Sequence, residues 1–175
     1  MRWLTPLAAL VAIGGCVAVP TPKPAPAPRP IPTAAPPLPP KPLPSDWRDW
    51  PYTPGDWVYR QDARGSIALF GVPGADASFT IRCDTTANAV YLSRAGSTAV
   101  PAAMTIRTST TVRTLPMQAT GGTPAYLAAT LQPRDALLEA MGFSRGRFVV
   151  EQPGLQTLVL PSWAEIERVT EDCRR

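Results

Sequence analysis

Three cysteines, Cys16, Cys83 and Cys173, carry the most reactive side chains of this 175-residue chain. The chain contains no histidine, and no lysine follows Lys41. The absence of histidine excludes a Ser-His-Asp triad, a Cys-His dyad and zinc held by histidine. The absence of lysine beyond residue 41 excludes a Schiff-base or P-loop lysine there. We therefore expect no cofactor, no metal site and no catalytic residue of these kinds.

Cys16 ends a leader built from three successive regions. Arg2 supplies a positive charge, residues 4–13 form a largely apolar run, and two glycines precede the cysteine. This order is typical of a secretory leader, and the run is shorter than the roughly 20 residues that span a membrane. Ile13-Gly14-Gly15-Cys16 resembles the lipobox of bacterial lipoproteins. The resemblance implies that residues 1–15 are a signal peptide and that Cys16 is acylated after cleavage.

The lipobox resemblance also implies a location. Val17, rather than aspartate, follows the cysteine. In lipoprotein sorting signals this points to the outer membrane of a Gram-negative cell. We expect a protein that acyl chains anchor in the cell envelope, facing the periplasm, with the membrane as one partner.

A proline-rich segment follows the leader. Residues 20–44 contain 13 prolines in 25 positions. Proline fixes φ near −65° and favours extended geometry in the residue before it, so polyproline II is expected. We predict that residues 16–46 form a lipidated linker and that residues 47–175 form one globular domain.

The formal net charge of +4 belongs to the leader and the linker. Residues 1–45 contain four basic and no acidic residues, whereas residues 46–175 contain 13 arginines and 13 acids. The globular domain is therefore neutral. This argues against nucleic acid as a partner.

Alternating and β-branched segments predict the fold of residues 47–175. In Ala77–Cys83, Phe79, Ile81 and Cys83 share one face, which is typical of a half-buried strand. Nine such segments predict a mainly β domain, an antiparallel meander that forms a sandwich or a partly open barrel. The predicted strands are 56–60, 66–70, 77–83, 88–94, 104–108, 110–115, 125–131, 146–152 and 155–160.

Two short helices are predicted near the end of the chain. The first, 134–141, lies between Pro133 and Gly142. The second begins with a capping box formed by Ser162 and Glu165. Its predicted buried stripe consists of Trp163, Ile166, Val169 and Cys173.

The remaining two cysteines predict a disulfide. If the lipid occupies Cys16, only Cys83 and Cys173 remain, and thiols usually pair in an oxidising compartment. Cys83 lies on the inward face of its predicted strand, and Cys173 lies on the buried stripe of the last helix. A redox pair would more typically be Cys-x-x-Cys. We predict a Cys83–Cys173 bond.

The globular domain resembles small, uncharacterised envelope lipoproteins of alphaproteobacteria. The resemblance lies in Asp62-Ala63-Arg64-Gly65-Ser66-Ile67-Ala68-Leu69-Phe70, Gly142-Phe143-Ser144-Arg145-Gly146-Arg147-Phe148 and Glu171-Asp172-Cys173-Arg174. Strands followed by a final helix with a cysteine are also distantly similar to invasion-associated locus B proteins. This likeness implies an architecture and no catalytic residue.

An aromatic run offers the candidate ligand site. Prolines 51 and 54 keep it extended, so alternate rings would project from one ribbon. Such rings suit a glycan or a proline-rich peptide. They could equally form a lid across the open end of the sheet, or bind the proline-rich segment of the same chain. The five residues are Trp47, Trp50, Tyr52, Trp57 and Tyr59.

The acidic residues suggest one catalytic alternative. Asp49, Asp56 and Asp62 could frame a pair of the glycosidase kind, although turn and capping roles also account for them. Ser144 lies in a Gly-x-Ser-x-Gly pattern, but the order of elements around it is reversed relative to a nucleophile elbow. The paired acids of the last helix are expected to be solvent exposed: Glu165, Glu167, Glu171 and Asp172.

The sequence thus predicts a lipid-anchored envelope protein with a non-catalytic domain that binds or scaffolds a periplasmic partner. The candidate partners are an envelope protein or a cell-wall glycan. The alternative is a carboxylate-dependent hydrolase acting on an envelope polymer.

Overall fold

A computed structural model describes residues 45–98 and 102–175 of the chain. These residues belong to one compact unit, Lys41–Arg175. The predicted signal peptide, Cys16 and the predicted linker up to residue 44 lie outside the described residues. The predictions made for them therefore stay predictions.

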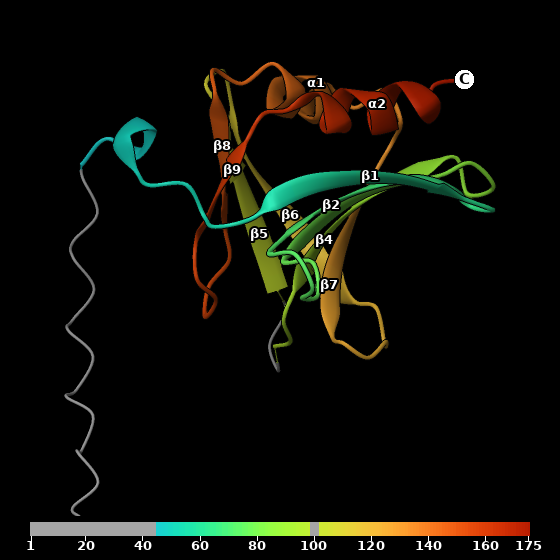
Figure 1. Cartoon of the computed structure of the whole chain (residues 1–175), viewed down its shortest axis with the longest axis horizontal. Helices are drawn as coiled ribbons and strands as arrows, with labels where there is room; N and C mark the ends of the chain where they lie inside the picture. Colours follow the sequence, from blue (N-terminus) through green and yellow to red (C-terminus); the bar gives the residue numbers. More distant parts are fainter. Residues whose placement is uncertain (1–44, 99–101) are drawn as a thin grey trace, which may run out of the picture. The chain divides into compact units, whose positions relative to one another are not determined.

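Nine strands form one antiparallel sheet in the order β1-β2-β3-β4-β7-β6-β5-β8-β9 (Figure 1). A short 3-10 helix, η1 (Trp47–Asp49), precedes the sheet, and two α-helices interrupt or follow it. The prediction of a mainly β fold with two helices is confirmed. The elements are β1 (Asp56–Asp62), β2 (Gly65–Gly71), β3 (Phe79–Asp84), β4 (Ala89–Ala95), β5 (Ala102–Arg107), β6 (Val112–Ala119), β7 (Tyr126–Leu131), α1 (Ala136–Gly142), β8 (Arg147–Glu151), β9 (Leu158–Pro161) and α2 (Ala164–Asp172).

The two edge strands of this open sheet are linked through the residues around the start of β1. The backbone N–H of Thr53 donates to the carbonyl oxygen of Val159 at 3.0 Å. In return, the N–H of Val159 donates to Thr53 Oγ1 at 2.9 Å. Trp57 Nε1 donates to the Pro161 carbonyl at 2.9 Å. The sheet therefore curls until β1 and β9 approach each other, as in the partly open barrel among the predicted arrangements.

Aromatic rings from both halves of the sheet meet in the core. Trp57 lies edge-on to Phe70 and Phe79, with ring centroids 5.4 and 6.4 Å apart. Phe79 on β3 in turn meets Phe148 on β8 at 6.3 Å. All four side chains are at most 5% exposed. These contacts hold β1–β3 against β8, and α2 covers the same inner face through Ile166 and other buried residues.

The predicted disulfide is confirmed. Cys83 and Cys173 are bonded, with Cα atoms 5.3 Å apart and 90 residues between them in sequence. Cys83 is fully buried and Cys173 is 8% exposed. The bond fastens the residue after α2 to β3.

The predicted capping box is wrong. Helix α2 has Trp163 at its N-cap and no side-chain cap bond. The backbone N–H of Ser162 instead donates to the Gly146 carbonyl at 3.2 Å, and its hydroxyl is buried without a hydrogen-bond partner. Ser162 therefore lies between the end of β9 and the N-cap of α2 and does not start the helix. Trp163 is 46% exposed and leaves the predicted stripe, whereas Ile166, Val169 and Cys173 are buried as predicted.

Helix α1 begins later than predicted. Its N-cap is Asp135, whose carboxylate accepts a hydrogen bond from the N–H of Leu137 at 2.9 Å. An aspartate that satisfies a free N–H in the first turn is a strong helix start. Arg134 therefore lies before the helix.

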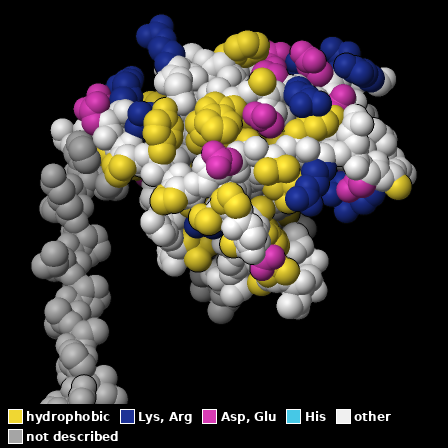
Figure 2. Space-filling view, viewed as in Figure 1, with side chains coloured by type: hydrophobic (Ala, Val, Ile, Leu, Met, Phe, Trp, Pro, Cys, Tyr) yellow, Lys and Arg dark blue, Asp and Glu magenta, His cyan; other side chains and the backbone are white. Residues whose placement is uncertain are grey.

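Charged side chains are mixed over the surface of the described residues. On the face seen in Figure 2, basic and acidic groups lie beside one another and form no large patch of one sign. Several are paired directly, including Arg113 with Asp135 at 2.6 Å and Arg107 with Glu151 at 3.3 Å. Basic and acidic side chains of the described residues thus neutralise one another in local pairs.

Candidate functional site

Two of the five predicted ligand-binding aromatics point into the protein. On β1, Trp57 and Tyr59 alternate with exposed residues and face the core side. Trp57 is 5% exposed. The hydroxyl of Tyr59 donates to Asp172 Oδ2 at 2.5 Å, and the Arg168 guanidinium lies 3.8 Å from its ring centroid. The placement of Trp57 in a ligand-binding ribbon is therefore wrong, because strand alternation turns it into the core.

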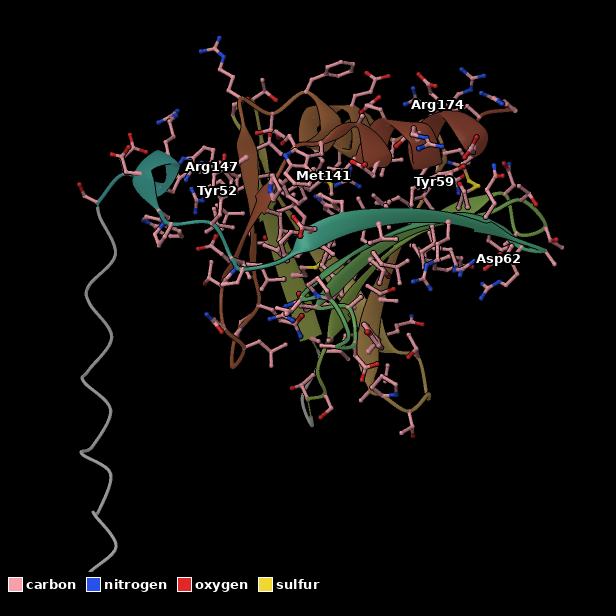
Figure 3. All side chains as sticks on the ribbon, in the orientation of Figure 1. Tyr52, Tyr59, Asp62, Met141, Arg147 and Arg174 are labelled. Atoms are coloured by element: carbon pink, nitrogen blue, oxygen red, sulfur yellow. A yellow bond between two sulfur atoms is a disulfide. The ribbon has the colours of Figure 1, made fainter. Side chains whose placement is uncertain are left out.

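The other three aromatics lie before β1, and two of them, Trp50 and Tyr52, contact the start of β8. Tyr52 donates to the Gly146 carbonyl at 3.1 Å, and the Arg147 guanidinium stacks on its ring at 4.1 Å. Arg147 also donates to the Trp50 carbonyl. Figure 3 shows Tyr52 beside Arg147, whereas Tyr59 lies well apart beneath α2. The five rings do not form one surface, and those near Arg147 correspond better to the predicted lid.

Trp47 contributes little to any shared site. It lies in η1, half-buried, with the Arg48 guanidinium 5.2 Å from its ring centroid. Asp46 accepts a hydrogen bond from the Arg48 backbone N–H at 2.9 Å, which lowers the pKa of this carboxyl. These contacts are local within the turn.

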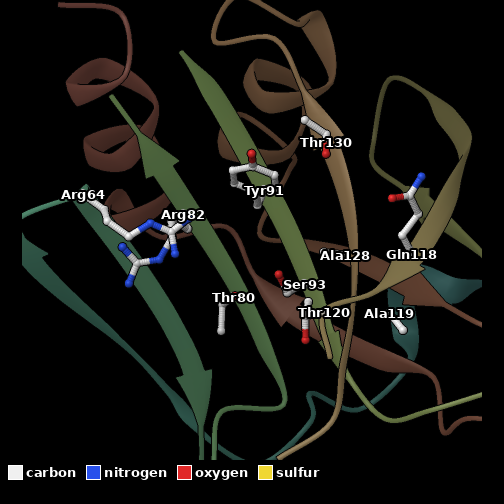
Figure 4. A pocket seen from close by; sticks show the side chains of 10 residues that line it. All are labelled: Arg64, Thr80, Arg82, Tyr91, Ser93, Gln118, Ala119, Thr120, Ala128 and Thr130. Carbon is white, nitrogen blue, oxygen red and sulfur yellow. The ribbon is translucent and has the colours of Figure 1, made fainter. Parts of the chain in front are cut away.

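A polar groove of about 450 Å³ lies on the face of β3, β4 and β7 that points away from α2 (Figure 4). We call it the outer groove. Its size falls within the roughly 300–1,000 Å³ typical of small-ligand sites. Its lining is mostly hydroxyl, amide and guanidinium groups: Arg64, Thr80, Arg82, Tyr91, Ser93, Gln118, Ala119, Thr120, Ala128 and Thr130.

Strand register brings these residues together. Arg82 on β3 is the Cα partner of Tyr91 on β4, which is the partner of Thr130 on β7. A second row, one alternation away, contains Thr80 and Ser93. Because neighbouring residues on a strand point to opposite faces, the polar residues between Phe79, Ile81 and Cys83 must face outward. The outward-facing polar residues of β3 thus line the outer groove. They alternate with the buried residues from which the sequence predicted this strand.

Arg64 and Arg82 form one charged wall of the outer groove, and each is paired with a carboxylate that lies outside the lining. Arg82 donates to both carboxylate oxygens of Asp62, at 3.0 and 2.8 Å. Arg64 donates twice to Asp84 Oδ2, at 3.0 and 2.6 Å, and its backbone N–H donates to Asp62 at 2.9 Å. Hydrogen bonds thus connect the two arginines with the two aspartates, and the four charges sum to zero.

The hydrogen bonds of this wall keep both carboxylates ionised. The Arg82 side chain is the main cause that lowers the pKa of Asp62. For Asp84, the backbone N–H of Ala87 is the main cause of the lowered pKa, and Arg64 is the next. A carboxyl that acts as a general acid needs a raised pKa, whereas the pKa values of these two carboxylates are lowered. The predicted turn role of Asp62 accords with its acceptance from the Arg64 N–H.

The other acidic candidates lie away from this groove. Burial raises the pKa of Glu167; the charge of Arg174 lowers it to a smaller extent, and the charges of Glu139 and Glu171 raise it further. Its Oε1 has no hydrogen-bond partner, and it lies so close to Gly142 that a Cβ there would meet it at 1.6 Å. Glu167 therefore faces α1 and lines none of the grooves described for this domain.

The expected solvation of the acids on α2 is only partly correct. Glu171 is exposed, whereas Glu165, Glu167 and Asp172 are half-buried. Asp172 differs from the expectation because Tyr59 packs beneath it and donates to it. Its role is structural.

Ser144 has no free hydroxyl for nucleophilic chemistry. It is 5% exposed. Its Oγ accepts from the Ser109 N–H at 2.9 Å and donates to the Arg147 carbonyl. A helix precedes it and a strand follows, which is the reverse of a nucleophile elbow.

A second groove, of about 580 Å³, lies beside the outer groove around β1 and the β2–β3 loop. Leu69 in this groove is the Cα partner of Thr80 in the outer groove, so the two adjoin. The second groove is more aliphatic, with Val58 46% and Val72 52% exposed. Sequence patterning identified neither groove, because both depend on which strands are neighbours in the sheet.

Within residues 45–98 and 102–175, no group of three His, Cys, Asp or Glu side chains is placed to hold a metal ion. No helix among those residues is long and apolar enough to cross a membrane. Comparisons with protein-family models, with curated proteins and with solved structures found no match to this chain.

Proposed function

We propose that this protein is anchored by a lipid in the cell envelope and binds a periplasmic ligand in the outer groove without transforming it. The lipobox-like Ile13-Gly14-Gly15-Cys16 supports the anchor. The single observation that carries the binding function is the lining of the outer groove. Polar side chains from β3, β4 and β7 converge there on the face that α2 does not cover.

A non-catalytic role is favoured over a carboxylate-dependent hydrolase. Hydrolysis by two carboxylates needs one acid with a raised pKa beside an ionised partner. The carboxylates beside the outer groove, Asp62 and Asp84, both have lowered pKa values. Glu167, with a raised pKa, packs against α1.

The balanced charge supports a partner other than nucleic acid. Nucleic-acid sites present clusters of unpaired Lys and Arg to the phosphates. Here Arg64 and Arg82 are both held by carboxylates. An envelope protein or a cell-wall glycan remains the candidate partner class.

Filling the outer groove tests this proposal. Thr130 is exposed at its rim, so Thr130→Trp should fill the groove with little effect on folding. Thr114→Trp is the matched control, because Thr114 is exposed on β6 and does not line the groove. The tagged full-length variants are used to capture envelope components.

We expect a component that wild type and Thr114→Trp retain and that Thr130→Trp loses. Equal capture by the two variants would contradict binding in the outer groove. Thermal unfolding of each variant confirms that the comparison concerns folded protein.

A further inference from the structure

Hydroxyl-bearing side chains from β3 and β4 line the outer groove. Thr80 on β3 is 8% exposed, and its side chain lines the groove. Tyr91 and Ser93 on β4 are half-buried and line the same groove. A hydroxyl that faces a groove can both donate and accept a hydrogen bond, so these groups are suited to bind a polar ligand.

The charged wall favours a ligand without net charge. A polyanion needs uncompensated guanidinium groups, whereas Arg82 already makes two hydrogen bonds to Asp62. Arg64 is likewise bonded to Asp84. The two pairs present donors and acceptors side by side, a pattern that matches neighbouring hydroxyl groups. The paired carboxylates weaken the attraction that Arg64 and Arg82 would otherwise have for an anion.

An aromatic ring lies at the centre of the lining. Tyr91 stands between Arg82 and Thr130 in the register of the sheet (Figure 4). A tyrosine offers an apolar ring and a hydroxyl in one rigid side chain. The ring can pack against the C–H face of a sugar while the surrounding groups bind its hydroxyls. Because the lining lies on paired strands, little ordering is needed on binding.

We infer that the ligand of the outer groove is a neutral, polyhydroxylated chain, that is, an uncharged glycan segment. This inference rests on the proposed binding function and adds the chemical class of the ligand. The hydroxyls of Thr80 and Ser93 bind its hydroxyl groups, Tyr91 packs against a ring, and the Arg–Asp pairs select against charge.

The test uses the full-length protein in detergent, with an array of neutral and acidic oligosaccharides followed by titration calorimetry on the best binder. Thr80→Val removes the hydroxyl and keeps the size and β-branching of the side chain. Ser93→Ala is a second, milder variant. Thr114→Val is the control, since it makes the same change on β6 outside the groove.

We expect a neutral oligosaccharide to bind and each groove variant to weaken it about three- to tenfold, the usual effect of one lost hydrogen bond. Thr114→Val should leave the affinity unchanged. Preferential binding of acidic oligosaccharides, or equal effects of Thr80→Val and Thr114→Val, would overturn the inference.

The inference and the proposed function fail in different ways. If no oligosaccharide binds but Thr130→Trp still abolishes capture of an envelope protein, the groove binds protein and the glycan assignment is wrong. If neither experiment distinguishes groove variants from their controls, both are wrong.

Discussion

Cys83 and Cys173 are bonded with their Cα atoms 5.3 Å apart, and this bond fixes the end of α2 over β3. On the opposite face of β3, Thr80 and Arg82 line the outer groove. The disulfide and the groove therefore share one strand. The covalent bond stabilises the strand that carries the candidate site without touching the site.

Removal of the disulfide should destabilise the domain. On chain-entropy reasoning, closing a loop of this length contributes roughly 4–5 kcal/mol, less any strain. Cys83→Ala with Cys173→Ala should lower the free energy of unfolding by a few kcal/mol and increase hydrogen exchange first in α2. Denaturant unfolding and hydrogen exchange measure both effects. Two free thiols in wild-type protein from an oxidising compartment would contradict the bond.

Arg94 should be a structural residue that lysine cannot replace. It is 7% exposed and donates to the carbonyls of Ser78, Ala95 and Gln156, at 3.0 to 3.1 Å. Burial lowers its pKa. An ammonium group cannot reach three carbonyls in this fork geometry, so Arg94→Lys should cost about 1–3 kcal/mol.

Chemical denaturation measures this cost, with Arg113→Lys as the control on the exposed side of β6. Since Gln156 lies in the β8–β9 connection, hydrogen exchange should increase there first. An Arg94→Lys protein as stable as wild type would show that the three bonds contribute little.

Glu167→Gln should stabilise the protein at neutral pH. Burial raises the pKa of Glu167 in the folded state, so the folded state binds the proton more tightly than the unfolded state. Ionisation of Glu167 therefore lowers the free energy of unfolding. This loss develops as the pH rises above the pKa of Glu167 in the unfolded state and through its higher pKa in the folded state. Glutamine removes this cost.

The difference in free energy of unfolding between Glu167→Gln and wild type should shrink as the pH falls below the ordinary pKa of a glutamate side chain. Unfolding curves at pH 7 and pH 4 measure it, and Glu165→Gln on the same helix is the matched control. A difference of the same size at both pH values would show that the effect is not ionisation of Glu167.

Cys16→Ser should abolish the lipid anchor. Only a thiol can form the thioether to diacylglycerol that the lipobox resemblance implies. The variant should accumulate as an uncleaved precursor without the acyl mass, which mass spectrometry of the N-terminus detects. The same acylated N-terminus in the variant would rule out Cys16 as the attachment site.

The sequence predicted the parts of the fold that depend on local patterns. Alternation in β3 identified its inward face, and the stripe of α2 placed Cys173 on the same buried side, so the disulfide followed. The capping box failed because a tertiary contact, from the Ser162 N–H to the Gly146 carbonyl, holds Ser162 outside the helix. Such a contact leaves no local pattern.

The candidate site could be predicted only in part, because it depends on strand order. Tyr91 and Thr130 meet because β4 pairs with β7, although β5 and β6 come between them in sequence. The sequence instead predicted a ligand site in the aromatic run, which includes two residues of β1. There, alternation sends Trp57 into the core, and an acid on α2 binds the hydroxyl of Tyr59.

Photo-crosslinking in cells tests the central claim, that the outer groove binds a ligand, most directly. A benzophenone side chain introduced at Thr130, on the groove rim, is compared with one at Val112, which is 54% exposed on β6. We predict a discrete adduct from position 130 that position 112 does not give, whether the adduct is a glycan or a protein. The absence of an adduct from position 130, or the same adduct from both positions, would contradict the claim.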